Sequence, residues 1–299
     1  MPTDTSIPNR LPSVGCDRLS HRNPLVYSLG VWYFRLKRRL QWWRQKEPFA
    51  QKRQDSPLGY RVHRHSSLLI RKLGDSDPQL QHNKIINLDI AVRHITGVII
   101  RPGEMFSFCR LVGKPTRKRG FVEGLQLSRG KAISGIGGGI CQIANLIHWL
   151  ALHSPLTVIE RSQHSYDPFP DEGRVIPFGT GASIFYNYVD YRLRNDTPHS
   201  FQLRLWLTEK TLEGELRCDH ELPHKYRVKE KNHAFLKIDG KFYRRNEIWQ
   251  YKTLKCRSEV EDEKLTTRNF ALVKYEPAEY VEINPTTHES ITSTGHDKL

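Results

Sequence analysis

The most regular hydrophobic pattern in the chain spans residues 140–153. Apolar side chains recur there at every third or fourth position, at Ile140, Ile143, Ala144, Ile147, Leu150 and Ala151. This spacing predicts a helix with one buried face, and Ser154-Pro155 ends it because proline cannot continue a helix. A glycine-rich run over residues 135–139 comes directly before the pattern. Cys141 therefore falls in the first turn of the predicted helix.

Three further segments have helical spacing. Residues 24–48 place leucine and tryptophan at regular intervals among arginines and lysines, at Leu25, Leu29, Trp32, Leu36, Leu40 and Trp43. Residues 66–74 and 82–97 follow the same period, and each ends at a glycine, which is typical of a helix end. The sequence thus predicts helices ahead of the Cys141 segment.

Beyond the Cys141 helix the hydrophobic pattern changes to a period of two, which is typical of strands. It predicts strands at 157–165, 182–188, 191–194, 200–208 and 212–217. Two short strands are also predicted before the Cys141 helix, at 98–100 and 105–108. Asp239-Gly240 between two alternating runs predicts a β-hairpin over 234–245. Residues 111–119 and 166–179 have the composition of loops. We therefore expect an α+β fold with N-terminal helices followed by an antiparallel sheet. One central Cys-bearing helix packs on that sheet, papain-like in element order.

Composition divides the chain into five regions. Residues 1–23 are polar and interrupted by proline, and residues 284–299 lack apolar content, so we expect a poorly ordered N-terminus and a disordered tail. Residues 24–65 form a basic amphipathic helical segment and linker. Residues 66–218 form the core domain, and 219–283 a C-terminal β-hairpin extension.

Composition also narrows the class of protein. With 37% hydrophobic residues and a mean hydropathy of −0.60, the chain does not resemble a polytopic membrane protein. Its five cysteines form no CxxC pair, which argues against a disulfide scaffold or a zinc site and favours a reducing compartment. Residues 1–24 contain no apolar stretch of a secretory signal. We therefore expect a cytoplasmic protein, with a peripheral position at the inner face of the membrane as the other location.

The positive charge is unevenly distributed. The net charge is +15, and residues 1–72 hold 15 Lys and Arg against 4 Asp and Glu, a difference of +11. A basic amphipathic helix at 24–48 suits an anionic membrane surface, with its aromatic and leucine face in the interface. The alternative is an ordinary helix packed on its own domain with a solvated basic face. No nucleic-acid-binding motif accompanies the charge, so nucleic acid is not an expected partner.

Cys141 is the candidate nucleophile. The unpaired N–H groups and the positive dipole end of a helix favour an anion, which predicts a lowered thiol pKa. A nucleophilic cysteine is commonly helped by a histidine, and His164 on the following strand-like segment is the best candidate base. The acid that would orient this base is left open among four residues: Asp167, Asp171, Glu172 and Asp190. We prefer Asp190, because it comes from a neighbouring predicted strand.

Substrate binding would fall to the residues around Cys141. Gly137, Gly138 and Gly139 permit positive φ angles and let a substrate lie close to the backbone. The backbone N–H groups of Cys141 and Gln142, together with the Gln142 side chain, are candidates for binding a developing oxyanion.

Three other polar residues near the candidate site have simpler explanations. Glu160 and Arg161 would form an ion pair or bind a carboxylate, and exposed pairs of this type are usually a solvated surface. His148 lies two helical turns after Cys141 and is expected in the core or in a groove. The histidines lack the spacing of a metal-binding motif, and the glycine-rich run lacks the ending of a phosphate-binding loop, so no metal or cofactor is expected.

Several motifs resemble the VanW family in order and spacing. They are NKIINLDIAV, RPGEMFSFCRLVG, GKAISGIGGGICQ, ERSQHSYDPFPDEGR and FYRRNEIW. The resemblance covers residues 24–275 and makes the core domain a VanW-type domain. Cys141, His164 and Asp190 fall on positions similar to the family's motif. The resemblance implies a role in vancomycin resistance and in the peptidoglycan of the cell wall.

Two hypotheses of function follow from this resemblance. In the first, Cys141 is deprotonated by His164 and transfers an acyl group of a peptidoglycan stem peptide or precursor, as in an L,D-transpeptidase or an amidase. In the second, the chain is a non-catalytic accessory protein that binds a cell-wall precursor or a partner at the inner membrane surface. Longer VanW-like proteins are often membrane-anchored and extracytoplasmic, and this sequence shows neither their anchor nor their extra modules.

Overall fold

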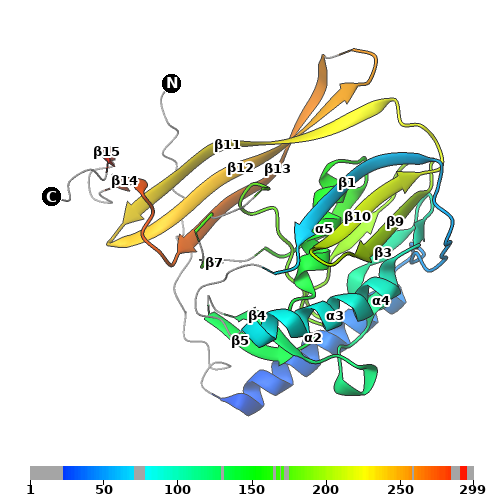
Figure 1. Ribbon diagram of the computed structural model, residues 1–299, viewed down its shortest axis with the longest axis horizontal. Helices are drawn as coiled ribbons and strands as arrows, with labels where there is room; N and C mark the ends of the chain where they lie inside the picture. Colours follow the sequence, from blue (N-terminus) through cyan, green and yellow to red (C-terminus); the bar gives the residue numbers. More distant parts are fainter. Residues whose placement is uncertain are drawn as a thin grey trace.

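The computed structural model describes residues 23–70, 78–128, 131–163, 166–168, 170–171, 175–257, 259–283 and 290–294. Its helices are α2 (Pro24–Arg44), α3 (Pro78–Ile95), α4 (Phe108–Val112) and α5 (Cys141–Leu152), with a 3-10 turn, η1, at Arg117–Arg119. Strands dominate the rest of the described chain, which confirms the α+β class (Figure 1). No helix within the described ranges is long and apolar enough to cross a membrane.

Helix α5 packs on a four-stranded antiparallel sheet. The sheet has the order β1-β10-β9-β2, with bounds Tyr60–Leu68, Thr211–Cys218, Phe201–Leu207 and Ile99–Ile100. The helix lies so close to β10 that a Cβ atom at Gly214 would be 2.8 Å from a methyl carbon of Leu146. The predicted packing of the cysteine-bearing helix on an antiparallel sheet is therefore confirmed.

The main core lies between this sheet and the helices α3 and α5. Its fully buried side chains come from the predicted helical stripes and from the sheet, and include Leu88, Ile95, Ile143, Ile147, Leu150, Phe201 and Leu203. Burial of each such side chain contributes about 1.5–3 kcal/mol to stability. The hydrophobic period of α5 thus positions Cys141, because the buried face fixes the rotation of the helix.

The described chain also contains two smaller sheets, of which the three-stranded one contributes Phe106 and Leu193 to the main core. A three-stranded antiparallel sheet has the order β3-β8-β6, with bounds Met105–Ser107, Arg192–Arg194 and Thr157–Glu160. The hairpin of β4 (Glu123–Ser128) and β5 (Lys131–Ile136) leads into the glycine-rich turn before α5. The turn therefore follows a strand directly, in contrast to the sequence interpretation, which placed no clear strand there.

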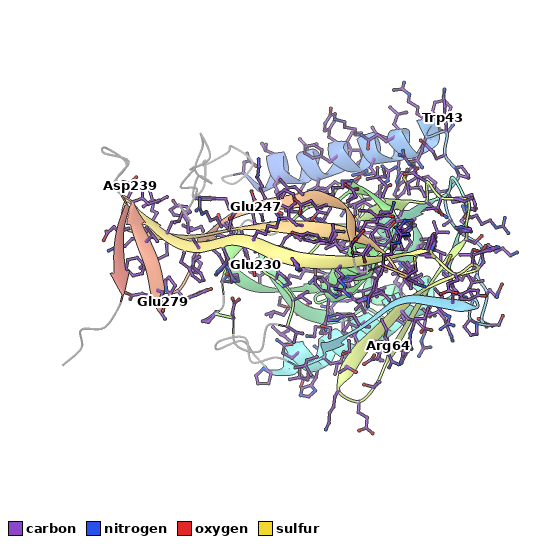
Figure 2. The ribbon with its side chains drawn as sticks, turned by 90° about the horizontal axis from the view of Figure 1, so that it is seen from above. Trp43, Arg64, Glu230, Asp239, Glu247 and Glu279 are labelled. Atoms are coloured by element: carbon purple, nitrogen blue, oxygen red, sulfur yellow. The ribbon has the colours of Figure 1, made fainter. Side chains whose placement is uncertain are left out.

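The C-terminal part of the chain forms a long ribbon that reaches away from the core (Figure 1). It consists of β11 (His224–Ile238), β12 (Lys241–Leu254) and β13 (Val260–Val273), flanked by β14 (Glu279–Ile283), β15 (Ser290–Thr294) and β7 (Tyr166–Asp167). The predicted hairpin is confirmed at Asp239 and Gly240, whose φ angles are 48° and 70°. Both residues thus have the left-handed conformation of a tight two-residue turn. Figure 2 shows Asp239 at the far tip of this ribbon.

Tertiary pairing overrides the helical pattern predicted at 66–74. Residues 66–68 belong to β1, where Ser67 lies opposite Leu212 and Leu68 opposite Thr211. The strand is favoured because it completes the edge of the sheet that carries α5, which a local periodicity does not reveal. Since β1 begins at Tyr60, it also crosses residue 66, where the core domain was predicted to begin. Residues 71–77 lie outside the described part of the chain.

Three other local predictions are wrong. Residues 182–188 are not a strand but an irregular segment, in which Phe185 bridges to Val189 across a turn. Residues 108–112 form α4 instead of strand and loop, because the Ser107 hydroxyl caps the helix by accepting the N–H of Arg110. In the tail, residues 290–294 pair with β14 instead of being disordered. The other tail residues predicted to be disordered, and residues 1–22, lie outside the described part.

Candidate functional site

A cleft of about 1180 Å³ lies at the amino end of α5. Its walls come from α3, α4, the glycine-rich turn, the first turn of α5 and the loops between β6 and β8. They include Gln81, Lys84, Cys109, Cys141, Asn145 and Phe178. This volume accommodates a small molecule or a short peptide.

Cys141 begins α5, as predicted, and lines this cleft. The backbone N–H of Ile184 donates to its sulfur at 3.4 Å, and the thiol lies 3.8 Å from the Ile184 carbonyl oxygen. Burial raises the pKa of Cys141, although the N–H groups of Ile184 and of Cys141 itself act in the opposite direction. The expected lowering of this pKa is therefore wrong for the free protein, because loss of water around the sulfur outweighs the helix amides.

The glycines before Cys141 are required by packing within the chain. Gly137 and Gly139 have φ angles of 77° and 93°, which side-chain-bearing residues rarely adopt. A Cβ atom at Gly138 would lie 2.1 Å from the backbone of Gly124, and one at Gly139 would lie 2.1 Å from Lys84 Cγ. Gly137 and Gly139 also line the cleft. The structure gives these glycines a packing role, and their role in substrate binding stays a prediction.

Of the two proposed partners of Cys141, the structure describes Asp190 but not His164. His164 lies outside the described residues, so its pairing with Cys141 stays a prediction. Asp190 is completely buried, and its carboxylate accepts the hydroxyl of Ser107 at 2.5 Å and the N–H groups of Cys109 and Tyr191, each at 2.8 Å. Burial raises its pKa. These contacts tie Asp190 to the first turn of α4.

Two of the other acids considered as orienting groups, Asp167 and Asp171, bind Arg244. Asp167 accepts from Arg244 at 3.0 Å and from the Tyr275 hydroxyl at 3.1 Å, and Asp171 accepts from both terminal nitrogens of the same arginine. Glu172 lies outside the described residues. These pairs connect the cleft loop to β12 of the long ribbon.

Gln142 and Arg161 hold neighbouring segments in place. The side-chain nitrogen of Gln142 donates to Ser67 Oγ at 2.9 Å and to the Leu68 carbonyl at 2.8 Å, and its backbone N–H donates to Gly139. Arg161 donates to the carbonyls of Gly179 at 2.8 Å and Gly181 at 3.0 Å. Gln142 therefore anchors the end of β1, and Arg161 anchors a loop that lines the cleft.

The expected pair between Glu160 and Arg161 is not formed. Glu160, the last residue of β6, instead binds Arg38 of α2, whereas Arg161 donates to the carbonyls of Gly179 and Gly181. His148 is buried, and its Nδ1 lies 3.0 Å from the Tyr191 hydroxyl, which confirms it as a core residue. Burial lowers the pKa of His148 well below its ordinary value.

Sequence reasoning missed Gln81, which lines the cleft from α3. Its side chain is only 4% exposed, yet neither its amide oxygen nor its amide nitrogen has a hydrogen-bond partner. Lys84 is also buried and lines the cleft one turn later. A signal was present in the sequence, since these polar residues extend the inward face of α3 defined by Leu88, Val92 and Ile95.

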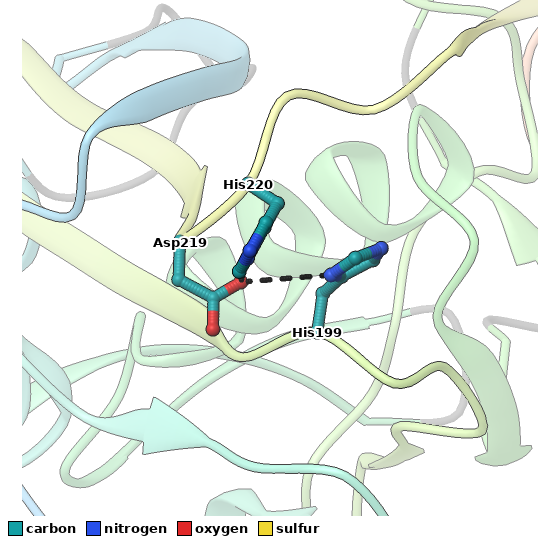
Figure 3. A group of neighbouring side chains, drawn as sticks. All are labelled: His199, Asp219 and His220. Atoms are coloured by element: carbon teal, nitrogen blue, oxygen red, sulfur yellow. Dashed lines mark hydrogen bonds and ion pairs between the residues drawn. The ribbon is translucent and has the colours of Figure 1, made fainter.

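A second polar group lies at the ends of β9 and β10 (Figure 3). The Nδ1 atoms of His220 and His199 lie 3.1 Å and 3.9 Å from the same oxygen of Asp219. One ligand atom from each residue lies within 4.8 Å of the others. Imidazole and carboxylate are ligands suited to zinc and similar ions. These are the described residues that could hold a metal ion, and strand pairing assembles them without any motif spacing.

The comparisons with known proteins agree with the motifs. A family model described as VanW like protein matches residues 83–217. The chain is 32% identical over 203 residues to the Vancomycin B-type resistance protein VanW of Enterococcus faecalis (strain ATCC 700802 / V583), covering 68% of this chain and 74% of that protein. It is 27% identical over 119 residues to the Uncharacterized protein YoaR of Bacillus subtilis (strain 168), covering 40% of this chain and 37% of that one. No solved structure matches. The chain therefore belongs to the VanW family.

Proposed function

We propose that this VanW-family protein acts in glycopeptide resistance and peptidoglycan metabolism by binding a peptidoglycan stem peptide or precursor in the cleft beside Cys141. The observation that carries the proposal is the position of a thiol in the first turn of α5, on the wall of a cleft large enough for a short peptide. The name of the Enterococcus faecalis relative supports the connection to vancomycin resistance.

In the proposed reaction, Cys141 transfers an acyl group of the bound peptide. The thiol proton passes to His164, and the sulfur attacks the carbonyl carbon of an amide. The C–N bond breaks as His164 gives the proton to the leaving amine, and a thioester remains on Cys141. An acceptor amine or water then attacks the thioester, the C–S bond breaks, and the sulfur regains a proton. No oxidant or reductant is needed.

Three polar groups around the thiol support peptide binding. The unpartnered amide of Gln81 offers one donor and one acceptor group to a peptide backbone. Lys84 places a cationic side chain in the same wall, which suits the carboxylates of a stem peptide. Asn145 accepts the N–H of Ala182 at 2.7 Å and so fixes the opposite loop.

A second candidate function is binding without catalysis. The observation that favours it is the raised pKa of Cys141, since a protonated thiol is a poor nucleophile. The cleft would then recognise the precursor, and the thiol would serve as an ordinary wall residue. The two functions differ in whether Cys141 forms a covalent bond to the ligand.

The test is covalent capture of a soluble stem pentapeptide by the full chain, followed by intact-protein mass spectrometry. Acyl transfer predicts a thioester adduct on the wild type and on Cys256→Ser, which removes an exposed cysteine outside the cleft. It predicts no adduct on Cys141→Ser or on His164→Ala. Calorimetric binding of the peptide without any adduct at pH 6–9 would support the non-catalytic function. Absence of both binding and adduct would overturn the proposal.

Thiol labelling with iodoacetamide provides an independent measurement. Cys141 should be protected in the free protein, because burial holds it in the protonated form. Under the acyl-transfer proposal, its labelling rate rises when an inert stem-peptide analogue occupies the rest of the cleft and orders the site. A rate that stays equal to that of the buried Cys218 in both states argues for the second function.

A further inference from the structure

Helix α2 carries an exposed apolar stripe. The stripe consists of six side chains that are between 44% and 80% exposed: Leu25, Leu29, Trp32, Leu36, Leu40 and Trp43. At about 100° per residue, these positions fall within roughly 80° of one another around the helix axis. They form a row from the second residue of the helix, Leu25, to its penultimate residue, Trp43. Figure 2 shows α2 along one side of the molecule, with Trp43 near its carboxyl-terminal end.

The opposite face of α2 is held against the protein by arginines. Arg38 is 8% exposed, forms a two-pronged ion pair with Glu160, and donates to the Tyr188 carbonyl at 3.3 Å. Arg35 donates to the Tyr186 carbonyl at 3.4 Å and lies over the ring of the same tyrosine. An amphipathic helix usually buries its apolar face and exposes its charges. Here Arg35 and Arg38 contact the protein, and the leucine and tryptophan row is exposed.

Exposed cations border the stripe. Arg39 lies on one side of the row, and Lys37 and Arg44 lie on the other, all with exposed side chains. The whole segment before residue 73 carries a net charge of +11. A surface that receives this face must accept an apolar row about 30 Å long and must carry negative charge on both sides of it.

We propose that the stripe of α2 docks the protein on an anionic lipid bilayer, with the helix axis parallel to the membrane plane. The leucine and tryptophan side chains enter the boundary between headgroups and acyl chains, and the flanking cations meet the acidic headgroups. A second copy of the chain is a poorer occupant, because pairing two stripes would bring identical cationic borders together. This inference is independent of the chemistry proposed for Cys141.

The experiment is co-sedimentation of the full chain with vesicles. We expect binding to vesicles of phosphatidylcholine with 30% phosphatidylglycerol, and at least tenfold weaker binding to pure phosphatidylcholine. The double variant Trp32→Asp/Trp43→Asp should lose at least tenfold in binding to the anionic vesicles. Val175→Asp is the matched control, because Val175 is 82% exposed outside α2, and it should bind as the wild type does. Circular dichroism and the melting temperature verify that each variant is folded.

Two further variants and two contrary outcomes complete the test. Lys37→Glu/Arg39→Glu should weaken binding to anionic vesicles and leave the melting temperature unchanged, since both side chains are exposed. Cys141→Ser should bind vesicles as the wild type does, which keeps this test separate from that of the cleft. The proposal is overturned if the wild type does not sediment with anionic vesicles. It is also overturned if light scattering shows a dimer that the tryptophan variant dissociates while vesicle binding is unaffected.

Discussion

The two terminal nitrogens of Arg38 lie 2.6 Å and 2.5 Å from the two carboxylate oxygens of Glu160. The pair joins α2 to β6 across 122 positions of the sequence. The same carboxylate also accepts the N–H of Asp190 at 3.1 Å. Together with the contacts of Arg35 and Arg38 to the carbonyls of Tyr186 and Tyr188, this ion pair holds one face of α2 against the protein.

Breaking this pair should destabilise the fold. Glu160→Ala leaves the guanidinium of Arg38 buried without its anion, and we expect a loss of about 2–3 kcal/mol in the free energy of unfolding. The loss stays below that of a fully buried pair because the Glu160 side chain is 26% exposed. Urea denaturation measures it. Asp89→Ala removes the exposed pair with Arg93 and should cost less than about 0.5 kcal/mol. Equal losses in the two variants would contradict this account of α2.

Gln81→Leu should separate stability from ligand binding. The substitution removes a buried amide that has no hydrogen-bond partner, so the free energy of unfolding should stay unchanged or rise by about 1 kcal/mol. Binding of a soluble stem pentapeptide should weaken roughly threefold to tenfold, because one or two hydrogen bonds to the ligand are lost. Calorimetric titration and urea denaturation measure the two effects. Gln79→Leu, on the exposed face of the same helix, should change neither. Unchanged affinity of Gln81→Leu would remove this residue from the ligand site.

Gly139→Ala should be far more damaging than Gly103→Ala. Both glycines have positive φ angles, so each alanine carries a backbone strain of about 1–2 kcal/mol. At Gly139 the new methyl group would also lie 2.1 Å from Lys84 Cγ, whereas at Gly103 no heavy atom lies within 4 Å. We expect a further loss of about 1–3 kcal/mol at Gly139 from this overlap. Thermal denaturation measures both variants. Similar melting temperatures would show that Lys84 moves away without cost.

Acid should destabilise the protein through a stacked histidine pair. The rings of His63 on β1 and His153 after α5 have centroids 3.8 Å apart. Burial lowers the pKa of His63 from 6.5 to about 3, and burial also lowers the pKa of His153. Between pH 6.5 and 3 the unfolded chain therefore binds protons that the folded chain does not, so the free energy of unfolding falls as the pH drops through this range and is recovered above it. Urea denaturation at pH 7.5, 6 and 5 measures the slope. His63→Phe should reduce it, and parallel profiles for variant and wild type would rule out this origin.

Residues whose structure depends on near neighbours were predictable. The stripe from Ile140 to Ala151 produced a helix with Cys141 in its first turn, and Asp239-Gly240 produced a tight hairpin turn. In both cases the deciding interactions lie within a few residues: side chains on one face of a helix, or φ angles that suit a two-residue turn. The strand at 66–68 was not predictable in this way, because its hydrogen-bond partners come from β10, more than 140 positions later.

For the candidate site, too, some features follow from the local sequence and others from contacts between distant segments. By itself, the sequence determined that a cysteine follows a glycine-rich turn at the start of an amphipathic helix, and that the chain has the motifs of the VanW family. Only the tertiary structure decided that burial raises the pKa of this cysteine, that Gln81 of α3 faces the same cleft, and that α2 exposes its leucine and tryptophan row. The reason is physical. Desolvation, cleft walls and exposed faces depend on contacts between distant segments, whereas helix and turn formation depend on residues adjacent in the chain.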